Sequence, residues 1–488
     1  MPFAFDTSYA RLPERFYRRV SAAPAARPEL LALNEPLARL LGLRPEELRT
    51  PESVARLAGN GAFEGSEPLA LAYAGHQFGG FSPQLGDGRA LLLGEVVGAD
   101  GVRRDVQLKG SGPTPFSRGG DGRAALGPVL REYVVSEAMH ALGIPTTRSL
   151  AAVATGQPVL RERPLPGAVL TRVAKSHLRV GTFEYFAARR DREGLERLLA
   201  YAIERHYPEC ARAERPALAF LDAVLDAQAR LVARWMGVGF VHGVMNTDNT
   251  SIAGETLDYG PCAFLDAYHP GRVFSSIDEG GRYAFGNQPR IALWNLARLA
   301  ETLLDAIHDD EKESVRLATE HLDRFPARYD AAFGAVMADK LGLSAGDETS
   351  ALADALLDVM TTAKADFTLT FRALAGAAVD RARGAELLAM LGGGTEAHAW
   401  LERWEARLPA DPAERAKAAL RMRSASPAFV PRNHRVEEMI TAATLGDLAP
   451  LERLMRVLAH PYDEQPAEAA LAEPPGEQQW RYRTFCGT

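Results

Sequence analysis

The sequence predicts an α+β fold, with a small sheet in the first part of the chain and a larger helical part after it. Between residues 73 and 112, short apolar segments alternate with glycine-rich turns, a pattern typical of paired strands. From about residue 195 onward, most segments carry the apolar period of about 3.6 residues that indicates helices. Strands followed by helices favour an enzyme with two lobes and a ligand cleft between them.

Composition and charge exclude several classes of protein. The 488 residues are 47% apolar and 24% charged, with a formal net charge of −7, as in ordinary globular proteins. That charge argues against a broad surface for nucleic acid or anionic membranes. No apolar run approaches the ~20 residues that span a bilayer, and the first 20 residues lack the apolar region of a secretory signal. We therefore expect a cytoplasmic protein with no nucleic-acid partner and no membrane partner.

Cysteine and histidine usage indicates no metal cluster. Cys210, Cys262 and Cys486 form no C-x-x-C motif, so neither a zinc site nor a disulfide framework is expected. His76 and His242 have no partner at metal-ligand spacing, and both are expected to be structural, hydrogen-bonded residues. We expect a monomer, although no residue pattern identifies the oligomeric state.

The chain divides into four predicted segments. Residues 1–75 alternate short helical patterns with proline breaks and are expected to form a helical extension that packs on the lobes. Residues 76–165 form the small lobe, with a hairpin of "ALLLGEVV" and "VQLK" around "GADG", followed by the helix "GPVLREYVVSEAMHALGI". Residues 166–425 form the helical lobe with the active-site loop, and residues 426–488 form a C-terminal helical extension and tail.

A glycine-rich turn and a strand lysine suggest phosphate binding. Gly86 and Gly88 flank an aspartate and precede Arg89, and glycines allow a backbone to approach a ligand and turn its N–H groups toward phosphate. Taken alone, such a turn is more often an ordinary hairpin turn. Lys109 follows at the end of "VQLK", as does the strand lysine that binds phosphates in protein kinases.

The kinase lysine pairs with a glutamate on the next helix, and here two glutamates compete for that role. Helical projection places Glu137 within the apolar stripe and Glu132 nearer the opposite side. The periodicity therefore favours Glu137 as the buried partner of Lys109.

Two further segments carry candidate nucleotide-binding residues. Asp121 and Gly122 lie in a flexible loop that enters the helix, where an ordinary turn is the simpler interpretation. Arg172 and Arg179 are seven residues apart, so they point the same way if this segment is a helix. The planar guanidinium group suits bidentate contacts with phosphate, although paired surface arginines are common.

The stretch from His242 to Asn249, "HGVMNTDN", matches the catalytic loop of protein kinases except at one position. Kinases have H-R-D-x-x-x-x-N followed by D-F-G, where the first aspartate is the base and the other two polar residues hold metal. Here Asn249 and the Asp258 of "DYG" keep the Mg²⁺ ligands, whereas Val244 stands at the base position. Asp248 is the nearest replacement carboxylate, and it would approach the substrate from a different position.

Long segments of the chain resemble the selenoprotein O family, nearly from end to end. The segments are "YAGHQFGGFSPQLGDGR", "LKGSGPTPFSRGGDGRAALGPVLREYVVSEAMHALGIPTTR", "TRVAKSHLRVGTFEYF", "HGVMNTDNTSIAGETLDYGPCAFLDAYHP", "GRYAFGNQPRIALWNL" and "FVPRNHRVEEMI". The resemblance implies a protein-kinase-like fold that works as a protein adenylyltransferase. It also implies that ATP binds inverted relative to kinases and that AMP is transferred to Ser, Thr or Tyr hydroxyls of protein substrates.

The resemblance also assigns roles to residues. It implies that Asp248 is the proton acceptor, that Asn249 is a ligand of Mg²⁺, and that Asp258 is a ligand that also contacts the nucleotide. It places Glu132, against the periodicity, as the partner of the lysine. The ATP-binding residues it implies are Gly86, Gly88, Arg89, Lys109, Asp121, Gly122, Arg172 and Arg179.

Other functions share many of these residues. Transfer of UMP from UTP with Mn²⁺ would use the same site, and a kinase would lack its base because Val244 replaces it. A silent pseudokinase that only binds partners is disfavoured, since Lys109, Asn249 and Asp258 remain. The resemblance also implies that some family members pair a C-terminal cysteine with a cysteine in an internal loop. This chain has Cys486, but Phe274 and no cysteine in that loop, so redox control by such a bridge is not expected here.

Overall fold

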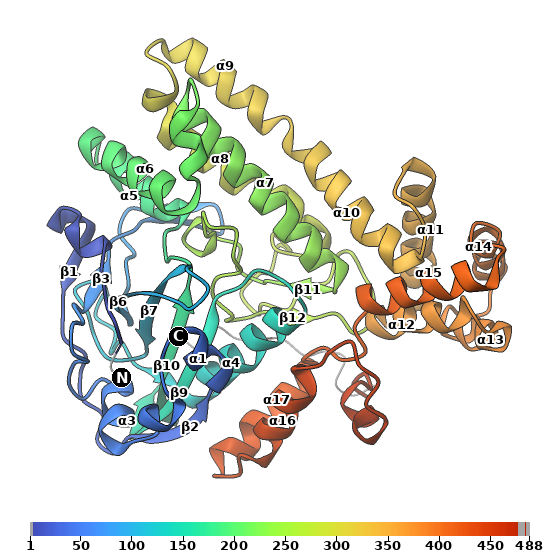
Figure 1. Ribbon diagram of the computed structural model, residues 1–488, viewed down its shortest axis with the longest axis horizontal. Helices are drawn as coiled ribbons and strands as arrows, with labels where there is room; N and C mark the ends of the chain where they lie inside the picture. Colours follow the sequence, from blue (N-terminus) through green and yellow to red (C-terminus); the bar gives the residue numbers. More distant parts are fainter. Residues whose placement is uncertain (1–2, 477–483, 485–488) are drawn as a thin grey trace.

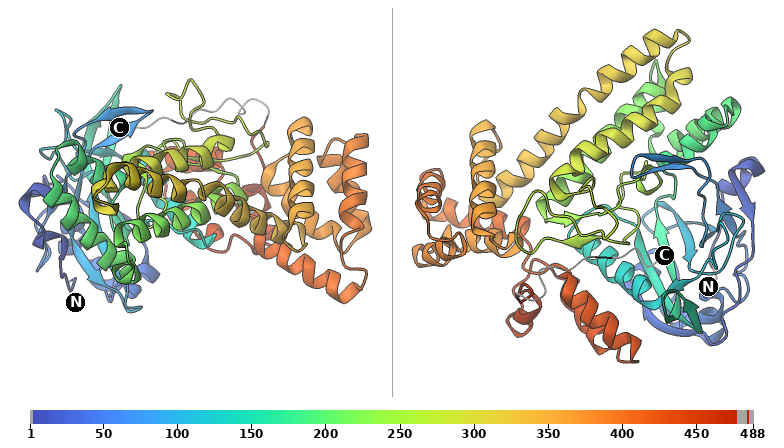
Figure 2. Two further views of the ribbon diagram at one scale, coloured as in Figure 1. Left: turned by 90° about the horizontal axis from the view of Figure 1, so that it is seen from above. Right: turned by 180° about the vertical axis from the view of Figure 1, so that it is seen from behind.

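The computed structural model describes residues 3–476 and Thr484, and it has an α+β architecture (Figure 1). The sheet lies at one end of the molecule, and the helices of residues 347–425 lie at the other end in all views (Figures 1 and 2). Between these ends, long helices run beside the loop that follows residue 241. The α+β class matches the expectation, whereas the kinase-like two-lobed fold stays a prediction.

The main sheet has eight strands within the described residues, and its neighbouring strands are antiparallel. The strand order is β1-β3-β6-β7-β10-β9-β2, and β8 also pairs with β10. Their bounds are β1 (Tyr17–Arg19), β2 (Glu29–Leu33), β3 (Leu69–Leu71), β6 (Ala90–Val97), β7 (Arg103–Lys109), β8 (Ala124–Ala125), β9 (Arg148–Leu160) and β10 (Pro164–Ala174).

The predicted hairpin is confirmed as β6 and β7. Lys109 is the last residue of β7 and lies between Ala90 of β6 and Leu170 of β10. The central place of β7 therefore brings the lysine to the middle of one end of the sheet. A separate two-stranded hairpin, β4 (Gly75–Gln77) and β5 (Gly80–Ser82), precedes it in the chain.

The expected helical extension over residues 1–75 is only half correct. It contains the short helices α1 (Glu35–Leu40), α2 (Pro45–Leu48) and α3 (Pro51–Leu57), but also β1, β2 and β3. Strands β1 and β2 form the two edges of the main sheet. A proline at the start of each short helix explains the helical pattern, and the extended stretches between them add to the sheet edges.

The predicted helix after the hairpin is α4 (Leu126–Ala141), and it is buried on nearly all sides. One side packs on β9 and β10, and another packs on α16 (Asn433–Thr444) and α17 (Ala449–Leu458). Val129 and Leu130 belong to the same apolar cluster as Val436 and Leu454. The C-terminal helices therefore complete the burial of the helix that carries both candidate glutamates.

Helices form most of the remaining chain. They are α5 (Val180–Ala188), α6 (Arg192–His206), α7 (Pro216–Gly237), α8 (Gln288–Ile307), α9 (Glu311–Leu322), α10 (Phe325–Leu341), α11 (Asp347–Ala363), α12 (Phe367–Ala377), α13 (Arg381–Met390), α14 (Thr395–Glu405) and α15 (Pro412–Ala425). Short 3₁₀ helices are η1 (Tyr9–Arg11), η2 (Glu14–Phe16), η3 (Pro208–Arg212), η4 (Thr247–Asn249), η5 (Phe285–Asn287) and η6 (Pro466–Leu471). Among the described residues, no helix is long and apolar enough to span a bilayer.

The loop with the kinase-like motif is anchored by a small sheet. Strands β11 (Phe240–Val241) and β12 (Ala263–Phe264) pair at its two ends. Near its end, Thr484 donates its Oγ1 hydrogen to the carbonyl oxygen of Pro261 (2.6 Å). Cys262 is buried without a disulfide, and Cys486 lies outside the described residues.

Candidate active site

A cavity of about 640 Å³ gathers every residue that the sequence places in the nucleotide and metal site. They come from seven separate stretches of the chain: Gly86, Gly88 and Arg89; Lys109; Asp121 and Gly122; Arg172; Arg179; Asp248 and Asn249; and Asp258. A larger cavity of about 1100 Å³, between residues 266–274 and α16, contains none of them. The individual roles of these residues stay predictions.

Four charged groups form one network at the inner end of the cavity. Lys109 Nζ donates to Glu132 Oε2 (2.6 Å) and to Asp258 Oδ1 (2.5 Å). Arg172 Nε donates to Glu132 Oε1 (2.7 Å), and its Nη2 lies 3.4 Å from Asp258 Oδ1. Burial alone would raise the pKa of Asp258, but Lys109 and Arg172 hold this pKa well below its usual range. The two carboxylates thus stay charged and fix the two cations.

The structure decides between the two candidate glutamates of α4. Glu132 pairs with Lys109, as the family resemblance implies. Glu137 instead accepts bonds from Arg148 (Nη2 to Oε2, 2.7 Å) and from Asn34 (Nδ2 to Oε2, 2.6 Å). The periodicity argument was wrong because α4 is buried on almost every side, so an apolar stripe does not mark the side that faces the cavity.

Asp258 has a strained backbone and one free oxygen. Its φ of +73° lies in the left-handed region, which costs a non-glycine residue on the order of 1–3 kcal/mol. Oδ1 accepts from Lys109 and from the backbone N–H of Tyr259 (3.1 Å). Oδ2 has no hydrogen-bond partner among the described residues, so it remains able to bind a ligand.

The glycine-rich turn differs from the expected phosphate cradle. The N–H groups of Gly86 and Gly88 donate to the carbonyl oxygens of Tyr73 (3.1 Å) and Gly86 (2.8 Å), so they do not point freely into the cavity. Gly86 has a φ of +70°, and a Cβ atom there would lie 2.3 Å from the ring of Phe116. The glycines are thus required by the turn and by the packing of Phe116.

Positive side chains, rather than backbone amides, dominate the outer part of the cavity. The guanidinium of Arg89 lines it and makes no side-chain hydrogen bond or ion pair with the residues that the structure describes, although the backbone carbonyl accepts from Gly110 N–H (2.7 Å). Arg179 lies 3.5 Å from Asp87 Oδ1 and stacks over the ring of Tyr73 (4.1 Å), while its buried Nε has no partner among the described residues. The sequence reasoning missed Asp87, since its contact with Arg179 spans 92 residues.

Arg172 and Arg179 do not lie on one helix. The expectation that they point the same way assumed a shared helix. Arg172 lies in β10, and Arg179 is the residue before α5. They reach the same cavity because the chain turns between them, at residues 175–178. The helical argument from their spacing was wrong, although both arginines line the site.

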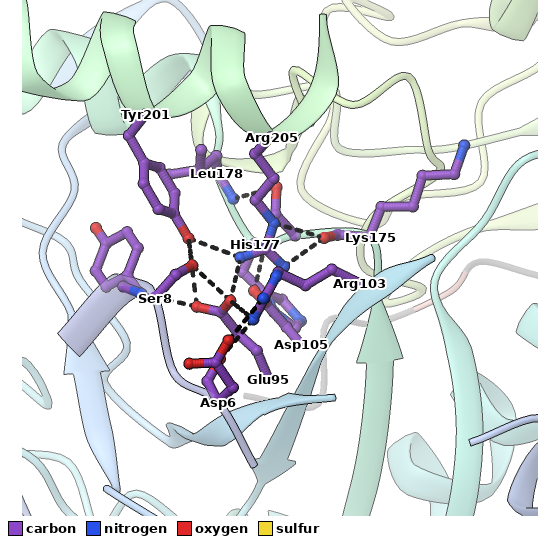
Figure 3. Close-up of polar contacts among 12 residues, drawn as sticks. Asp6, Ser8, Glu95, Arg103, Asp105, Lys175, His177, Leu178, Tyr201 and Arg205 are labelled. Carbon is purple, nitrogen blue, oxygen red and sulfur yellow. Dashed lines mark hydrogen bonds and ion pairs between the residues drawn. The ribbon is translucent and has the colours of Figure 1, made fainter. Parts of the chain in front are cut away.

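A buried ionic network holds this turn (Figure 3). His177 donates its backbone N–H to Asp105 Oδ2 (2.8 Å). Arg205 of α6 reaches Asp105 of β7 (2.5 Å) and Glu95 of β6 (2.9 Å). Burial would raise the pKa of Asp105, but the charge of Arg205 and the hydrogen bonds from His177 hold this pKa below its usual range. The network therefore fixes the strands and α6 around the segment that leads to Arg179.

Asp121 and Gly122 form part of the rim. Asp121 is exposed and pairs with Arg161 (2.9 Å). Gly122 has a φ of +62°, and a Cβ atom there would lie 2.1 Å from the carbonyl oxygen of Gly112. The glycine is required by backbone packing, and Arg161 partly neutralises the aspartate.

Asp248 presents a carboxylate oxygen without a partner. It lies in η4, where Gln77 Nε2 donates to its Oδ2 (3.2 Å), while the buried Oδ1 accepts no hydrogen bond from the described residues. Burial raises the pKa of Asp248 to about 6. A Cβ atom on Gly75 would lie 2.7 Å from Oδ1, so the carboxylate occupies space that only a glycine leaves. Neither Gln77 nor Gly75 was among the predicted site residues, although both lie in the quoted "YAGHQFGG" segment.

Both histidines are hydrogen-bonded, as expected. His242 Nε2 lies 3.1 Å from the carbonyl oxygen of Leu257. His76 Nδ1 lies 2.5 Å from Glu184 Oε1, and Thr247 Oγ1 donates to Glu184 Oε2 (2.5 Å). This second chain of bonds supports the residue immediately before Asp248.

The donor set fits a magnesium ion. Asn249 uses its amide nitrogen to donate to the carbonyl oxygen of Val244 (3.1 Å), which leaves its oxygen for a ligand, as does Asp258 with Oδ2. The described residues contain no group of three His, Cys, Asp or Glu side chains suited to a metal. Mg²⁺ commonly takes one or two protein oxygens and completes its shell with water and phosphate, so these two residues suit it.

Comparison with known proteins identifies the family. A model of the family described as "Protein adenylyltransferase SelO" matches residues 1–459. The chain belongs to the SelO family. Similar curated proteins are each named protein nucleotidyltransferase YdiU. Those of Bradyrhizobium sp. (strain BTAi1) and Methylorubrum populi are 60% and 59% identical, over 100% of this chain and 99% of each relative. That of Nitrobacter hamburgensis is 58% identical, over 100% of this chain and 97% of the relative. This SelO-family chain is therefore a nucleotidyl-transferring enzyme.

Proposed function

We propose that this SelO-family enzyme transfers AMP from ATP to Ser, Thr or Tyr hydroxyls of proteins and releases pyrophosphate. The family description as a protein adenylyltransferase supports both the nucleotide and the protein substrate. The proposal includes a protein-kinase-like arrangement of the sheet and helices, with ATP inverted relative to kinases. We also propose that the enzyme acts as a cytoplasmic monomer.

The position of the free carboxylate carries this proposal. Val244 occupies the position of the kinase base and lines the cavity, where its side chain cannot accept a proton. Asp248 lines the same cavity and has a buried oxygen without a hydrogen-bond partner. A base moved by four residues suits chemistry at a different phosphate from the one that kinases attack.

The proposed reaction is a single displacement at the α-phosphorus. The acceptor hydroxyl oxygen forms a bond to this phosphorus while its proton passes to Asp248. The bond from the α-phosphorus to the oxygen bridging to the β-phosphate breaks, and the electron pair leaves with pyrophosphate. Arg89, Arg172 and Arg179 hold the phosphate chain and offset its charge, so positioning and electrostatic stabilisation supply most of the rate.

The metal would be held by Asn249 Oδ1 and Asp258 Oδ2. When bound, Mg²⁺ supplies charge neutralisation to the phosphate oxygens. Lys109 keeps Asp258 ionised and oriented through their 2.5 Å contact, and Glu132 holds Lys109 in turn.

Transfer of UMP from UTP with Mn²⁺ is the second candidate. The relatives are named nucleotidyltransferases, and this name does not say which nucleotide they transfer. The charged residues of the cavity suit the phosphates, which ATP and UTP share. Competition between labelled ATP and UTP, with Mg²⁺ or Mn²⁺, measures the preference through the ratio of the two kcat/KM values.

The position of the label tests the proposal directly. The enzyme is incubated with Mg²⁺, unfolded casein as a general acceptor, and ATP labelled at either the α- or the γ-phosphate. We expect label on protein from the α-position only, and none with Asp258→Asn. Label from the γ-position would establish a kinase, and no label from either would reject nucleotide transfer to these hydroxyls.

Asp248→Asn separates catalysis from nucleotide binding. The amide keeps the size of the side chain but cannot accept the proton, so the transfer rate should fall by about 10²–10⁴-fold. The dissociation constant for ATP, measured by calorimetry, should change little because the arginines remain. An unchanged transfer rate would remove Asp248 from the role of base.

A further inference from the structure

The hairpin of β4 and β5 is fixed to the loop that carries Asp248. His76 donates its backbone N–H to Thr247 Oγ1 (2.6 Å), and Gln77 donates its side-chain amide to Asp248 Oδ2 (3.2 Å). At the tip, the N–H of Phe78 donates to Asn246 Oδ1 (3.2 Å). The hairpin therefore stands immediately beside the proposed base.

Aromatic side chains collect on this hairpin and on the residues beside it. We call His76, Phe78, Phe81 and Trp294 the aromatic platform, and the buried Tyr283 supports it from beneath. Phe81 and Trp294 both lie against His76, with ring centroids 4.8 and 5.3 Å away, and Phe78 lies 5.0 Å from Tyr283. Phe78 and Phe81 are 37% and 42% exposed, far more than aromatic residues that serve a core.

The backbone holds the tip of the platform in an unfavourable conformation. Phe78 has a φ of +51°, in the left-handed region that a bulky side chain rarely occupies. Its N–H also donates to Tyr283 Oη (3.1 Å), and this hydroxyl in turn donates to Asn246 Oδ1 (2.6 Å). Strain of this kind persists at positions where surrounding bonds impose it, and it is concentrated at functional sites.

We propose that the aromatic platform is the docking surface for the protein substrate. The occupant is an extended segment that bears the acceptor hydroxyl and an apolar side chain within three residues of it. This inference rests on the proposed function, because the acceptor is what must reach Asp248. An extended chain advances about 3.3 Å per residue, so a residue three positions from a hydroxyl at Asp248 stands about 10 Å from it, within reach of the hairpin that contacts Asp248.

The composition of the surface supports a protein partner. Partly exposed aromatic residues and arginine are enriched where proteins bind one another. Arg282 stacks over Trp294 (4.7 Å) and would lie 3.6 Å from a Cβ atom on Gly79, which places a cation at the edge of the platform. The two-stranded hairpin pairs with no further strand in the described part of the chain, so β5 offers an edge for strand addition.

The surface lies outside the nucleotide cavity. Gln77 lines that cavity, whereas Phe78 and Phe81 do not. The geometry therefore gives no reason to assign the platform to the nucleobase of ATP. A change in ATP affinity on removal of either ring would overturn the assignment to a protein segment.

The test uses the full chain and synthetic 13-residue peptides. Each peptide contains one threonine as its single acceptor in an alanine, glycine and lysine background, with either leucine or asparagine two residues away. Transfer of α-labelled AMP is measured for the wild type, Phe81→Ala, Phe78→Ala and the partial restoration Phe81→Leu. Leu420→Ala, on α15, removes a side chain that is 61% exposed and is the matched control.

We expect the wild type to prefer the leucine peptide, with a KM at least tenfold lower than that for the asparagine peptide. Phe81→Ala and Phe78→Ala should remove this preference, Phe81→Leu should restore part of it, and Leu420→Ala should leave it unchanged. The dissociation constant for ATP and the Tm should stay at wild-type values in all variants.

The possible failures are distinguishable. No α-label on casein with the wild type would contradict the proposed function itself. If casein is labelled, the proposed function stands. The platform is then overturned by any of three results: no peptide is labelled, the leucine peptide is not preferred, or both alanine variants keep the preference.

Discussion

At the scale of single residues, the position of the proposed base depends on the absence of a side chain at Gly75. The carboxylate of Asp248 lies where a Cβ atom of residue 75 would stand, with Oδ1 only 2.7 Å from that position. Gln77 holds the other oxygen, and Thr247 is bonded to Glu184 on α5. A small residue at the start of β4 is therefore part of the geometry of the proposed base, although it carries no functional group.

Gly75→Ala tests this steric requirement. The added methyl group should displace the carboxylate and reduce AMP transfer by about 10²-fold, the cost of misplacing a reacting group by about 1 Å. ATP binding, measured by calorimetry, should persist because the arginines lie on other elements. Gly80→Ala is the control, since its Cβ atom would meet nothing closer than Gln77 O at 3.5 Å. Equal rates for the two variants would contradict the requirement.

At the scale of elements, α4 assigns different tasks to two glutamates five residues apart. Glu132 bridges Lys109 and Arg172, which line the cavity, while Glu137 joins the helix to Arg148 of β9 and to Asn34. Both are buried, so neither burial nor apolar periodicity distinguishes them. The packing of α16 and α17 on α4 fixes which side of the helix remains beside the cavity.

Paired substitutions separate these two tasks. Glu132→Gln should lower the transfer rate by about 10²-fold, because Lys109 and Arg172 lose the carboxylate that positions them. Glu137→Gln should keep the rate within a few-fold of wild type but reduce stability by roughly 3 kcal/mol, the loss on breaking a buried ion pair. Initial rates and thermal unfolding measure the two effects. The opposite pattern would reverse the assignment of the glutamates.

Other elements show what local patterns can and cannot predict. The hairpin of β6 and β7 was predictable because its strands, its turn and its alternation are neighbours in sequence. The strands β1 and β2 were not, because each pairs with a strand more than 50 residues away. The glycine-rich turn was located correctly, but its N–H groups are already bonded to residues 71, 73 and 86.

At the scale of the whole molecule, the helical end contains a buried cation that affects stability. Lys340 of α10 is buried, and its Nζ lies 4.3 Å from the ring of Phe371 and 3.3 Å from the carbonyl oxygen of Ala425. Burial lowers the pKa of Lys340 to about 7. Between pH 7 and about 10.5 the unfolded chain therefore holds this proton more tightly than the folded chain does.

This difference predicts a pH-dependent stability. The free energy of unfolding should rise with pH by up to about 1.4 kcal/mol per unit in that window. Below pH 7, the destabilisation caused by the buried charge of Lys340 should be complete. Lys340→Met removes the penalty, so its gain in Tm over the wild type should be largest near pH 7 and shrink toward pH 10. Lys312→Met, at an exposed position of α9, should show no such trend. A pH-independent gain would contradict the lowered pKa.

The sequence by itself determined the α+β class, the hairpin, α4 and the nucleotide- and metal-site candidates, all of which line the cavity. The elements follow from local periodicity. The site candidates follow from motif residues that occur in the same order along the chain as in the family that it resembles. Only the tertiary structure decided which glutamate meets Lys109, that Asp87 contacts Arg179, and that Gly75 makes room for Asp248. Each of these contacts joins segments distant in sequence, and its geometry depends on how whole elements pack, which no local pattern encodes.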